Sequence, residues 1–222
     1  MSGRFDPSRT TRTDFPRVAS HLVQKALGLP TATLHEAGGR IGALPCAIKP
    51  IAAGMRLAGP AFTVHSPGGD NLWLHRAIVA AQAGDVLVVH ADDAYEYGYW
   101  GEIMATAAQA RGIAGLVIDG GVRDAALLEE MNFPAFSRTV CIRGTAKDFT
   151  ARGFLGHPLR LGDADIQPGD LIVGDRDGVV AIPRARADEI ILAAQNREAK
   201  EAEILQRLLA GETTMGIYDL GV

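Results

Sequence analysis

The chain has 222 residues, of which 47% are hydrophobic and 22% are charged, and its formal net charge is −4. This composition is ordinary for a globular enzyme, and the length suits one large domain or two small ones, of which we favour one. The acidic balance, without any basic block, argues against a nucleic-acid partner.

No apolar run approaches the roughly 20 residues needed to cross a membrane, and no hydrophobic segment of a signal peptide follows Met1. We therefore expect a cytoplasmic protein without a membrane partner. Cys46 and Cys141 are far apart in the sequence and form no CxxC motif. Free buried thiols are expected rather than a disulfide or a cysteine metal site.

The N-terminal part predicts an arm followed by helices. Residues 1–16 contain glycine, prolines and small polar residues, which indicates a flexible arm or one that packs on a neighbouring molecule, and residues 17–222 are expected to form a single domain. Apolar residues at helical spacing predict a helix over 15–29, ended by Gly28 and Pro30. A short helix over 34–37 follows, and strands are expected over 47–51 and 57–65.

The middle of the chain alternates between strands and helices. Helices are predicted over 72–83, 101–110 and 125–131, and strands over 85–90, 115–118 and 135–142, with residues 91–100 as an acidic and aromatic loop. Gly120-Gly121 is expected to break the strand that ends at Ile118. This alternation is typical of a parallel α/β sheet.

The pattern changes from Thr145 onward. Short strands over 159–161, 171–174 and 178–183 are divided by Asp-Gly and Pro-Gly turns, which indicates a barrel or the edge of a sandwich. A long helix rich in Glu, Lys and Ala is expected over about 186–210. The predicted fold is α/β, a layered α/β/β-type sandwich with a central parallel or mixed sheet or barrel, plus N- and C-terminal helices.

Two junctions between a strand or loop and a helix carry the candidate chemistry. Glu102 stands at the first, and Arg123-Asp124 at the second. In neighbouring parallel strands such junctions converge at the carboxyl edge of the sheet, where ligands bind. Carboxylates supply hard oxygen ligands for Mg²⁺ or a similar ion, and an arginine supplies a planar donor fork for a carboxylate or a developing enolate. The free N–H groups of a helix N-terminus suit an anion.

Helix capping is the alternative interpretation of these residues. Aspartate and glutamate favour the first turn of a helix, and an arginine beside them can form an ordinary surface ion pair. Spacing alone does not decide between the two interpretations.

A family resemblance favours the first. Glu102, twenty intervening residues and Arg123-Asp124 resemble the acid–X20–Arg–Asp signature of the class II pyruvate aldolases related to the regulator of ribonuclease E activity A. The resemblance runs from about Thr31 to the C-terminus and is closest to the 4-hydroxy-4-methyl-2-oxoglutarate/4-carboxy-4-hydroxy-2-oxoadipate aldolase branch. Further matching stretches are Gly69-Asp70-Asn71 with His75, Gly84-Asp85-Val86-Leu87-Val88, Gly98-Tyr99-Trp100-Gly101-Glu102, Pro168-Gly169-Asp170 and Asp175-Arg176-Asp177-Gly178.

The resemblance implies a lyase that acts on small oxo-acids. A divalent cation, Mg²⁺ or Mn²⁺, would sit on Asp124, with Glu102 helping directly or through water. Arg123 and the metal would stabilise the pyruvate enolate left by carbon–carbon cleavage, and oxaloacetate decarboxylation would be a side activity. The pyruvyl carboxylate would lie on the backbone amides of Gly101, Glu102, Ile103 and Met104.

Other roles are implied at the edge of the pocket. Asn71 and His75 would reach it, although His75 also suits a hydrogen-bonded helix residue, and Lys147 suits either a substrate contact or the surface. Homotrimers, often stacked as hexamers, are implied, with Glu201 of a neighbouring subunit as a further acid. The alternative for Glu201 is a solvated helix face.

The sequence departs from the family pattern in two places. Glu102 stands where aspartate is common, and its extra methylene affects whether it meets the metal directly. Residues 148–163 lack the stretch expected there, which leaves the substrate side of the pocket open.

Other functions are less consistent with the residues. A Schiff-base aldolase needs a desolvated lysine, yet none of the four lysines lies in one of the continuously apolar strands predicted for the middle of the chain. The six histidines show no HxxxH pairing, which argues against a zinc site, and no GxGxxG opens a helix after a strand. The remaining rival is a non-enzymatic regulator of ribonuclease E activity that acts by protein–protein binding, and the presence of Glu102, Arg123 and Asp124 together favours the enzyme.

Overall fold

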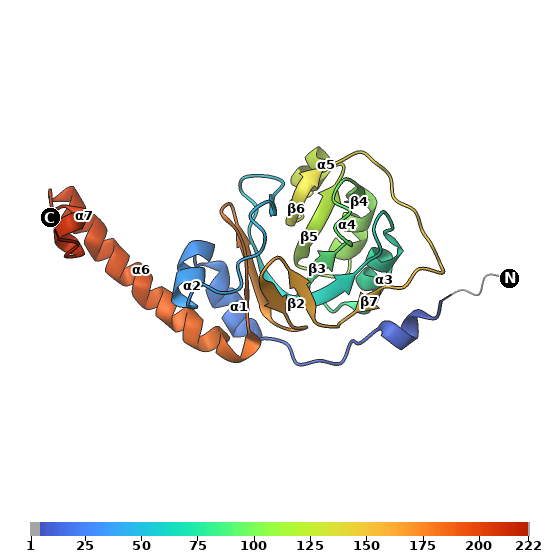
Figure 1. Ribbon diagram of the computed structural model, residues 1–222, viewed down its shortest axis with the longest axis horizontal. Helices are drawn as coiled ribbons and strands as arrows, with labels where there is room; N and C mark the ends of the chain where they lie inside the picture. The colour runs from blue at the N-terminus through green and yellow to red at the C-terminus, as the bar shows by residue number, and fades with distance from the viewer. Residues whose placement is uncertain (1–4, 222) are drawn as a thin grey trace.

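The computed structural model of the chain describes residues 5–221 (Figure 1). Residues 1–4 of the expected arm and the last residue lie outside the described residues. The α/β class expected from the sequence is confirmed: a mixed sheet curls into a nearly closed barrel, and helices cover it from two sides.

Four parallel strands form the centre of the sheet. They lie in the order β6-β5-β3-β2, and β10 and β11 continue the sheet antiparallel from β2, while β1 pairs antiparallel with β6. Because β1 also contacts β10 and β11, the two ends of the sheet approach each other. The bounds are β1 Lys49–Pro50, β2 Leu57–His65, β3 Val86–His90, β5 Gly115–Val122, β6 Ala135–Val140, β10 Leu171–Asp175 and β11 Gly178–Ile182.

Shorter strands complete the structure. β4 (Gly98–Trp100) runs parallel to the end of β5, and β7 (Phe154–Leu155) pairs with the end of β2. β8 (Leu159–Leu161) and β9 (Ala164–Ile166) form a separate hairpin.

The helices form two groups (Figure 1). One group packs beside β2, β3 and β5, and the other packs against β10 and β11, from which α6 extends away from the sheet. The first group comprises α3 (Leu72–Ala80), α4 (Glu102–Gln109) and α5 (Ala125–Glu130). The second comprises α1 (Ser20–Leu27), α2 (Thr31–Ala37) and α6 (Ala187–Leu209), with α7 (Thr214–Ile217) at its far end. Short 3₁₀ turns cover Pro7–Thr10 and Arg184–Arg186.

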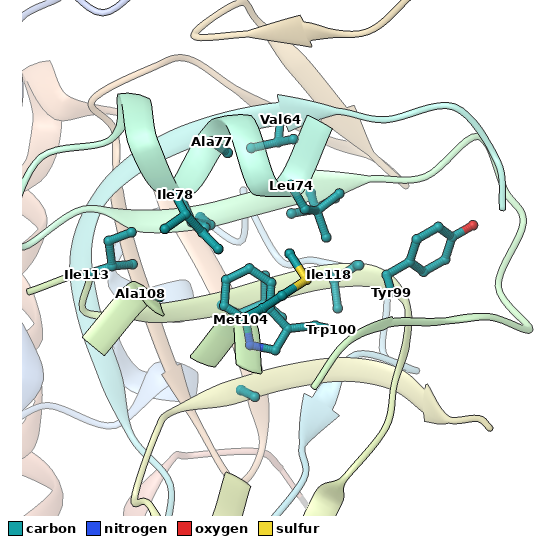
Figure 2. Close-up of a cluster of buried hydrophobic side chains, with 14 of the residues drawn as sticks. Val64, Leu74, Ala77, Ile78, Tyr99, Trp100, Met104, Ala108, Ile113 and Ile118 are labelled. Carbon is teal, nitrogen blue, oxygen red and sulfur yellow. The ribbon is translucent and has the colours of Figure 1, made fainter. Parts of the chain in front are cut away.

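Alternation along the strands explains why their sequences are apolar almost throughout. Leu87 and Ile118 face the cluster under α3 and α4, whereas their neighbours Val88 and Val117 point into the barrel. Figure 2 shows the first cluster, with Trp100 and Met104 between the helices and the sheet. Strands buried on both faces read as continuous hydrophobic runs, and each large side chain so buried contributes about 1.5–3 kcal/mol.

The glycine pair Gly120-Gly121 does not end β5, which is a correction to the sequence analysis. The strand continues to Val122, with an irregular register between Ile118 and Gly121. A Cβ at Gly121 would lie 2.5 Å from the Tyr97 carbonyl oxygen, and one at Gly120 would lie 3.1 Å from the Tyr99 ring. The two glycines therefore admit β4 alongside β5, in a stretch expected to be a loop.

The part of the arm that the structure describes contacts its own chain. The Phe5 N–H donates to the Phe149 carbonyl (2.9 Å), and the Arg12 N–H donates to the Leu155 carbonyl (2.9 Å). The Phe5 ring lies 6.1 Å from the ring of Trp73. A flexible or neighbour-bound arm stays a prediction.

Two further expectations concern the whole chain. Both cysteines are free, as expected, but the expected burial is wrong, since Cys46 is exposed and Cys141 is half-buried. Among the described helices, none has the length and apolar character required to traverse a lipid bilayer.

Asp175 at the end of β10 holds the start of α2. Pro30 occupies the N-cap position and makes no side-chain cap. Instead the Asp175 carboxylate accepts from the Thr31 N–H (2.9 Å), the Thr31 hydroxyl (2.6 Å) and the Asp177 N–H (2.9 Å). Burial alone would raise the pKa of Asp175, but these hydrogen bonds hold the pKa below its ordinary value of 3.8.

The stability that Asp175 contributes should therefore depend on pH. A lowered pKa in the folded state means that the contribution is complete above 3.8 and is lost as the pH falls through the lower folded value. We expect Asp175→Asn to lower the free energy of unfolding by about 2 kcal/mol at pH 7, as for hydrogen bonds to a charged group. Urea unfolding at several pH values should show this difference shrinking below pH 4. The control is the exposed Asp163→Asn, and a difference that does not change with pH would contradict this role.

Candidate active site

The two expected junctions lie side by side because β4 and β5 are parallel neighbours. Trp100 is the register partner of Val122, and the Arg123 N–H donates to the Trp100 carbonyl at 2.8 Å. The residues that follow each strand, Gly101 with α4 and Arg123 with Asp124, therefore meet at the carboxyl edge of the sheet.

Asp124 joins the two junctions. It occupies the N-cap position of α5 with a φ of 56°, yet its side chain makes no cap bond there. Its Oδ2 accepts instead from the Glu102 N–H (3.1 Å) at the start of α4, and lies 3.7 Å from Nε of Arg123. Left-handed backbone at a residue other than glycine costs on the order of 1 kcal/mol and recurs at functional sites. The capping interpretation thus applies to α4, not to α5.

Glycines at both ends of β4 make room for Arg123 and Asp124. A Cβ at Gly101 would lie 2.3 Å from Oδ2 of Asp124 and 3.1 Å from Cγ of Arg123. A Cβ at Gly98 would lie 2.4 Å from the Cys141 carbonyl oxygen and 3.1 Å from Cβ of Arg123. A larger residue at Gly101 would displace the carboxylate of Asp124, and one at Gly98 would push against the Cys141 backbone and Arg123.

A small pocket of about 140 Å³ opens beside Arg123. It lies between the start of α3, the start of α4, the end of β5 and the segment after β6. Its lining residues are Asn71, His75, Tyr99, Gly101, Ile103, Met104, Arg123 and Lys147. The pocket suits a small organic anion, because it combines two cationic side chains with a helix N-terminus.

The amides at the start of α4 are not equally available. The Glu102 N–H donates to Asp124, and the Met104 N–H donates to the Gly101 carbonyl (3.1 Å). The Ile103 N–H makes no hydrogen bond within the described residues, and Ile103 lines the pocket. Of the amides expected to hold the carboxylate, that of Ile103 is therefore the clearest donor.

Asn71 offers an acceptor at the pocket. Its Nδ2 donates to the Tyr99 carbonyl (3.0 Å) and to Sδ of Met104 (3.4 Å). Its Oδ1 is buried and has no hydrogen-bond partner within residues 5–221. A buried acceptor without a partner is costly unless a ligand or water satisfies it. The Leu72 N–H at the start of α3 is satisfied by Asp70 (2.7 Å), which leaves Asn71 free for the pocket.

Lys147 is brought to the pocket by backbone pairing. The Ala146 N–H donates to the Gly69 carbonyl (2.8 Å), and the Asn71 N–H donates to the Ala146 carbonyl (3.2 Å). On the other side, the Asp148 N–H donates to the Asp70 carboxylate. Burial, and next the charge of Lys147, lower the pKa of His75. His75 is therefore neutral near pH 7, and the pocket's cations are Arg123 and Lys147.

The remaining sequence candidates lie outside the pocket lining. Glu102 is exposed at the first turn of α4. Glu201 pairs with Arg197 (2.8 Å) on α6, which extends away from the sheet in Figure 1. Within its own chain Glu201 does not line the pocket. None of residues 148–163, where the sequence departs from the family pattern, lines it either; that segment packs on Phe5, Trp73 and the end of β2.

The carboxylates of Asp124 and Glu102 suit a hard cation. Mg²⁺ is commonly held by one or two carboxylates and keeps several waters. Within the described residues, Oδ1 of Asp124 makes no hydrogen bond, and 36% of its side chain is exposed. Glu102 is exposed beside it. The donor set therefore fits the divalent cation implied by the resemblance.

Comparisons with known proteins show the family to which the chain belongs. A family model described as "RraA-like: Aldolase/RraA" matches residues 21–181. A protein of Halalkalibacterium halodurans named "Putative 4-hydroxy-4-methyl-2-oxoglutarate aldolase" is 35% identical over 186 residues, which cover 82% of this chain and 88% of that protein.

Solved structures show the same fold. An uncharacterized protein from Pseudomonas syringae pv. tomato has a TM-score of 0.78 and 32% identity, covering 91% of this chain and 94% of that one. A Streptomyces coelicolor protein described as an unusual member of the RNase ES inhibitor RraA protein family has a TM-score of 0.73 and 29% identity, covering 85% and 98%. The chain therefore belongs to the RraA-like family, which is described as Aldolase/RraA.

Proposed function

We propose that this protein is a divalent-metal-dependent lyase. It cleaves 4-hydroxy-2-oxo acids of the 4-hydroxy-4-methyl-2-oxoglutarate type to pyruvate through a pyruvate enolate, and decarboxylates oxaloacetate as a side activity. One observation carries the proposal: the Arg123 side chain and the Ile103 N–H lie in the same pocket, and the Asp124 carboxylate lies beside it. The name of the Halalkalibacterium halodurans relative supports this class of substrate.

The substrate carboxylate takes the N-terminal end of α4. There the Ile103 N–H is free to donate, and the helix dipole favours negative charge. Lys147 adds a second positive charge at the pocket, which suits a substrate with two carboxylates. The unpaired Oδ1 of Asn71 accepts a hydrogen bond from the substrate hydroxyl, which would otherwise leave a buried acceptor unsatisfied.

Cleavage places charge on the oxygen of the 2-oxo group. The C3–C4 bond breaks and its electron pair forms the pyruvate enolate, while the C4 hydroxyl gives its proton to water as the new carbonyl forms. C3 of the enolate then takes one proton back from water, which leaves pyruvate. The backbone bond to Trp100 holds the Arg123 main chain against β4, and Nε of its guanidinium lies 3.7 Å from Oδ2 of Asp124. The guanidinium is thus beside the site before charge develops. When bound at Asp124, with Glu102 as a direct or water-mediated ligand, Mg²⁺ or Mn²⁺ supplies Lewis-acid polarisation of the same oxygen.

We also propose that the protein assembles as a homotrimer or hexamer in which Glu201 of one subunit approaches the site of the next. Glu201 lies on α6, away from the pocket of its own chain, and the far part of α6 with the residues after it exposes Leu205, Leu209 and Tyr218. Apolar side chains gathered on a projecting element favour a covered surface. A monomer by light scattering would remove Glu201 from the site.

Activity should depend on Arg123, Asp124 and the metal together. We expect metal-free protein to release no pyruvate from 4-hydroxy-4-methyl-2-oxoglutarate or oxaloacetate above the metal-only blank, and Mg²⁺ or Mn²⁺ to restore release. Arg123→Ala should lower kcat by about 10²–10³-fold, as for loss of one donor to a developing oxyanion, and Asp124→Asn should abolish the metal response. The exposed Arg160→Ala is the control. Pyruvate release that is indifferent to Arg123→Ala would contradict the lyase.

The second candidate is a regulator that binds a ribonuclease, which the likeness to the RraA-family protein of Streptomyces coelicolor favours. It predicts a stable complex with a ribonuclease or helicase in a pull-down, unaffected by Arg123→Ala. It also predicts no metal-dependent release of pyruvate.

Gly101→Ala should disable the site without unfolding the chain. The φ of Gly101 is −155°, which any residue adopts, so the backbone tolerates alanine. The new Cβ would nevertheless meet Oδ2 of Asp124 at 2.3 Å and move it. A displacement of about 1 Å at a reacting group costs about 100-fold in rate. Gly54→Ala is the matched control, since its Cβ would meet nothing within 4 Å. Equal kcat values for the two variants would show that the Asp124 position does not matter.

A further inference from the structure

Two histidines lie together at the carboxyl ends of two central strands of the sheet. Neither of them lines the pocket beside Arg123. His65 ends β2 and His90 ends β3, and the two are register partners of neighbouring parallel strands. Their side chains project from the same face, and their ring centroids are 5.6 Å apart. Just after β3 the chain turns back, so that Oδ1 of Asp92 lies 2.7 Å from Nε2 of His65.

These three side chains have the composition and spacing of a metal site. One ligand atom from each of His65, His90 and Asp92 lies within 4.8 Å of the other two. Ligand atoms around a tetrahedral ion at about 2.1 Å are about 3.4 Å apart, so small rotations of the side chains complete the set. All three are partly exposed, at 28%, 23% and 47% of the side chain, which gives an ion access from solvent.

The surroundings favour a cation. Asp93 lies 3.6 Å from Nε2 of His90, and Asp119 is the register partner of His90 on β5. Among the described residues, Arg138 balances these acids through its 2.6 Å contact with Asp119. Nδ1 of His65 is buried in the part of the chain that the structure describes. Nε2, which lies 2.7 Å from Oδ1 of Asp92, is therefore the nitrogen of His65 that is open to an ion.

We propose that His65, His90 and Asp92 form a second cation site, selective for a transition-metal ion such as Zn²⁺ or Co²⁺. Imidazole nitrogens favour these ions, whereas the all-oxygen pair Asp124 and Glu102 favours Mg²⁺ or Mn²⁺. Three protein ligands leave one position of a tetrahedral ion open to water. The sequence argued against a zinc site because no two histidines are close together along the chain. In the structure, the pairing of β2 with β3 brings His65 next to His90.

An ion in this site would tether the segment that leads to the active-site strand. Asp92 begins the loop that reaches β4, and in this loop the Ala94 carbonyl accepts from the Tyr99 hydroxyl (2.8 Å). Tyr99 belongs to β4 and lines the pocket beside Arg123. The loop from Asp92 to Tyr99 therefore connects the proposed cation site to the pocket beside Arg123. The two sites share no ligand residue.

The test is cobalt binding to the full-length protein in the Glu102→Gln/Asp124→Asn background, which removes both proposed magnesium ligands. After chelation and dialysis, we expect this protein to bind one equivalent of Co²⁺ with visible absorption bands that Zn²⁺ displaces. Adding His65→Asn or Asp92→Asn should weaken Zn²⁺ binding by at least about 100-fold, since loss of an outer-shell partner alone costs about 10–100-fold. The exposed His21→Asn should change nothing.

Two outcomes would overturn the proposal. One is the absence of Co²⁺ bands in the background protein. The other is Zn²⁺ affinity that is unchanged by both Asp92→Asn and His65→Asn, which would leave His65 and Asp92 as an ordinary hydrogen-bonded pair. Asp92→Asn preserves the shape and volume of the side chain. Circular dichroism of each variant is the check on folding, so that loss of binding by a folded variant reports on the ligands.

Discussion

The parallel pairing of β4 with β5 is the constraint on which the site depends. A three-residue strand lies against the last residues of β5, and the bond from the Arg123 N–H to the Trp100 carbonyl fastens the end of one to the end of the other. Two chain segments separated by about twenty residues are thereby held in one register. Without this pairing, α4 and the Arg123-Asp124 turn would be independent loops.

Everything else at the site follows from that close approach. The two strands come near enough only because Gly98, Gly101, Gly120 and Gly121 carry no side chains. The Asp124 carboxylate then satisfies the first amide of α4, and the Ile103 N–H is left to face the pocket. In the proposed lyase, this short network of hydrogen bonds would set where a substrate carboxylate binds and where Arg123 lies relative to the enolate.

The buried strands could be predicted from the sequence because they are apolar over their whole length. The candidate residues Glu102, Arg123 and Asp124 came from the resemblance to the acid–X20–Arg–Asp signature, and their roles stay a prediction. The prediction for Gly120-Gly121 was wrong, because glycine can either end a strand or allow another strand to approach closely. Only the presence of β4 beside β5 distinguishes the two cases. Lys147 reaches the pocket through pairing with residues 69–71, and His65 meets His90 through sheet register. Neither contact leaves a local pattern, because both depend on how distant segments are arranged.

The family contains proteins named as aldolases and proteins named as ribonuclease inhibitors, so the fold alone does not assign the activity. What separates the two functions is whether this pocket stabilises charge on a substrate oxygen. An inhibitor of a ribonuclease does not need the groups that surround this small cavity. These groups are the free Ile103 N–H, the buried and unpaired Oδ1 of Asn71, and the cationic side chains of Arg123 and Lys147.

The most direct measurement is hydrogen exchange at the methyl group of pyruvate. A site that stabilises the pyruvate enolate must also form it from pyruvate, by removal of a methyl proton. In D₂O with Mg²⁺ or Mn²⁺, we predict that the wild-type protein deuterates the pyruvate methyl group, seen as loss of its proton NMR signal, and that Arg123→Ala does not. Exchange no faster than the metal-only blank for the wild-type protein would contradict the account.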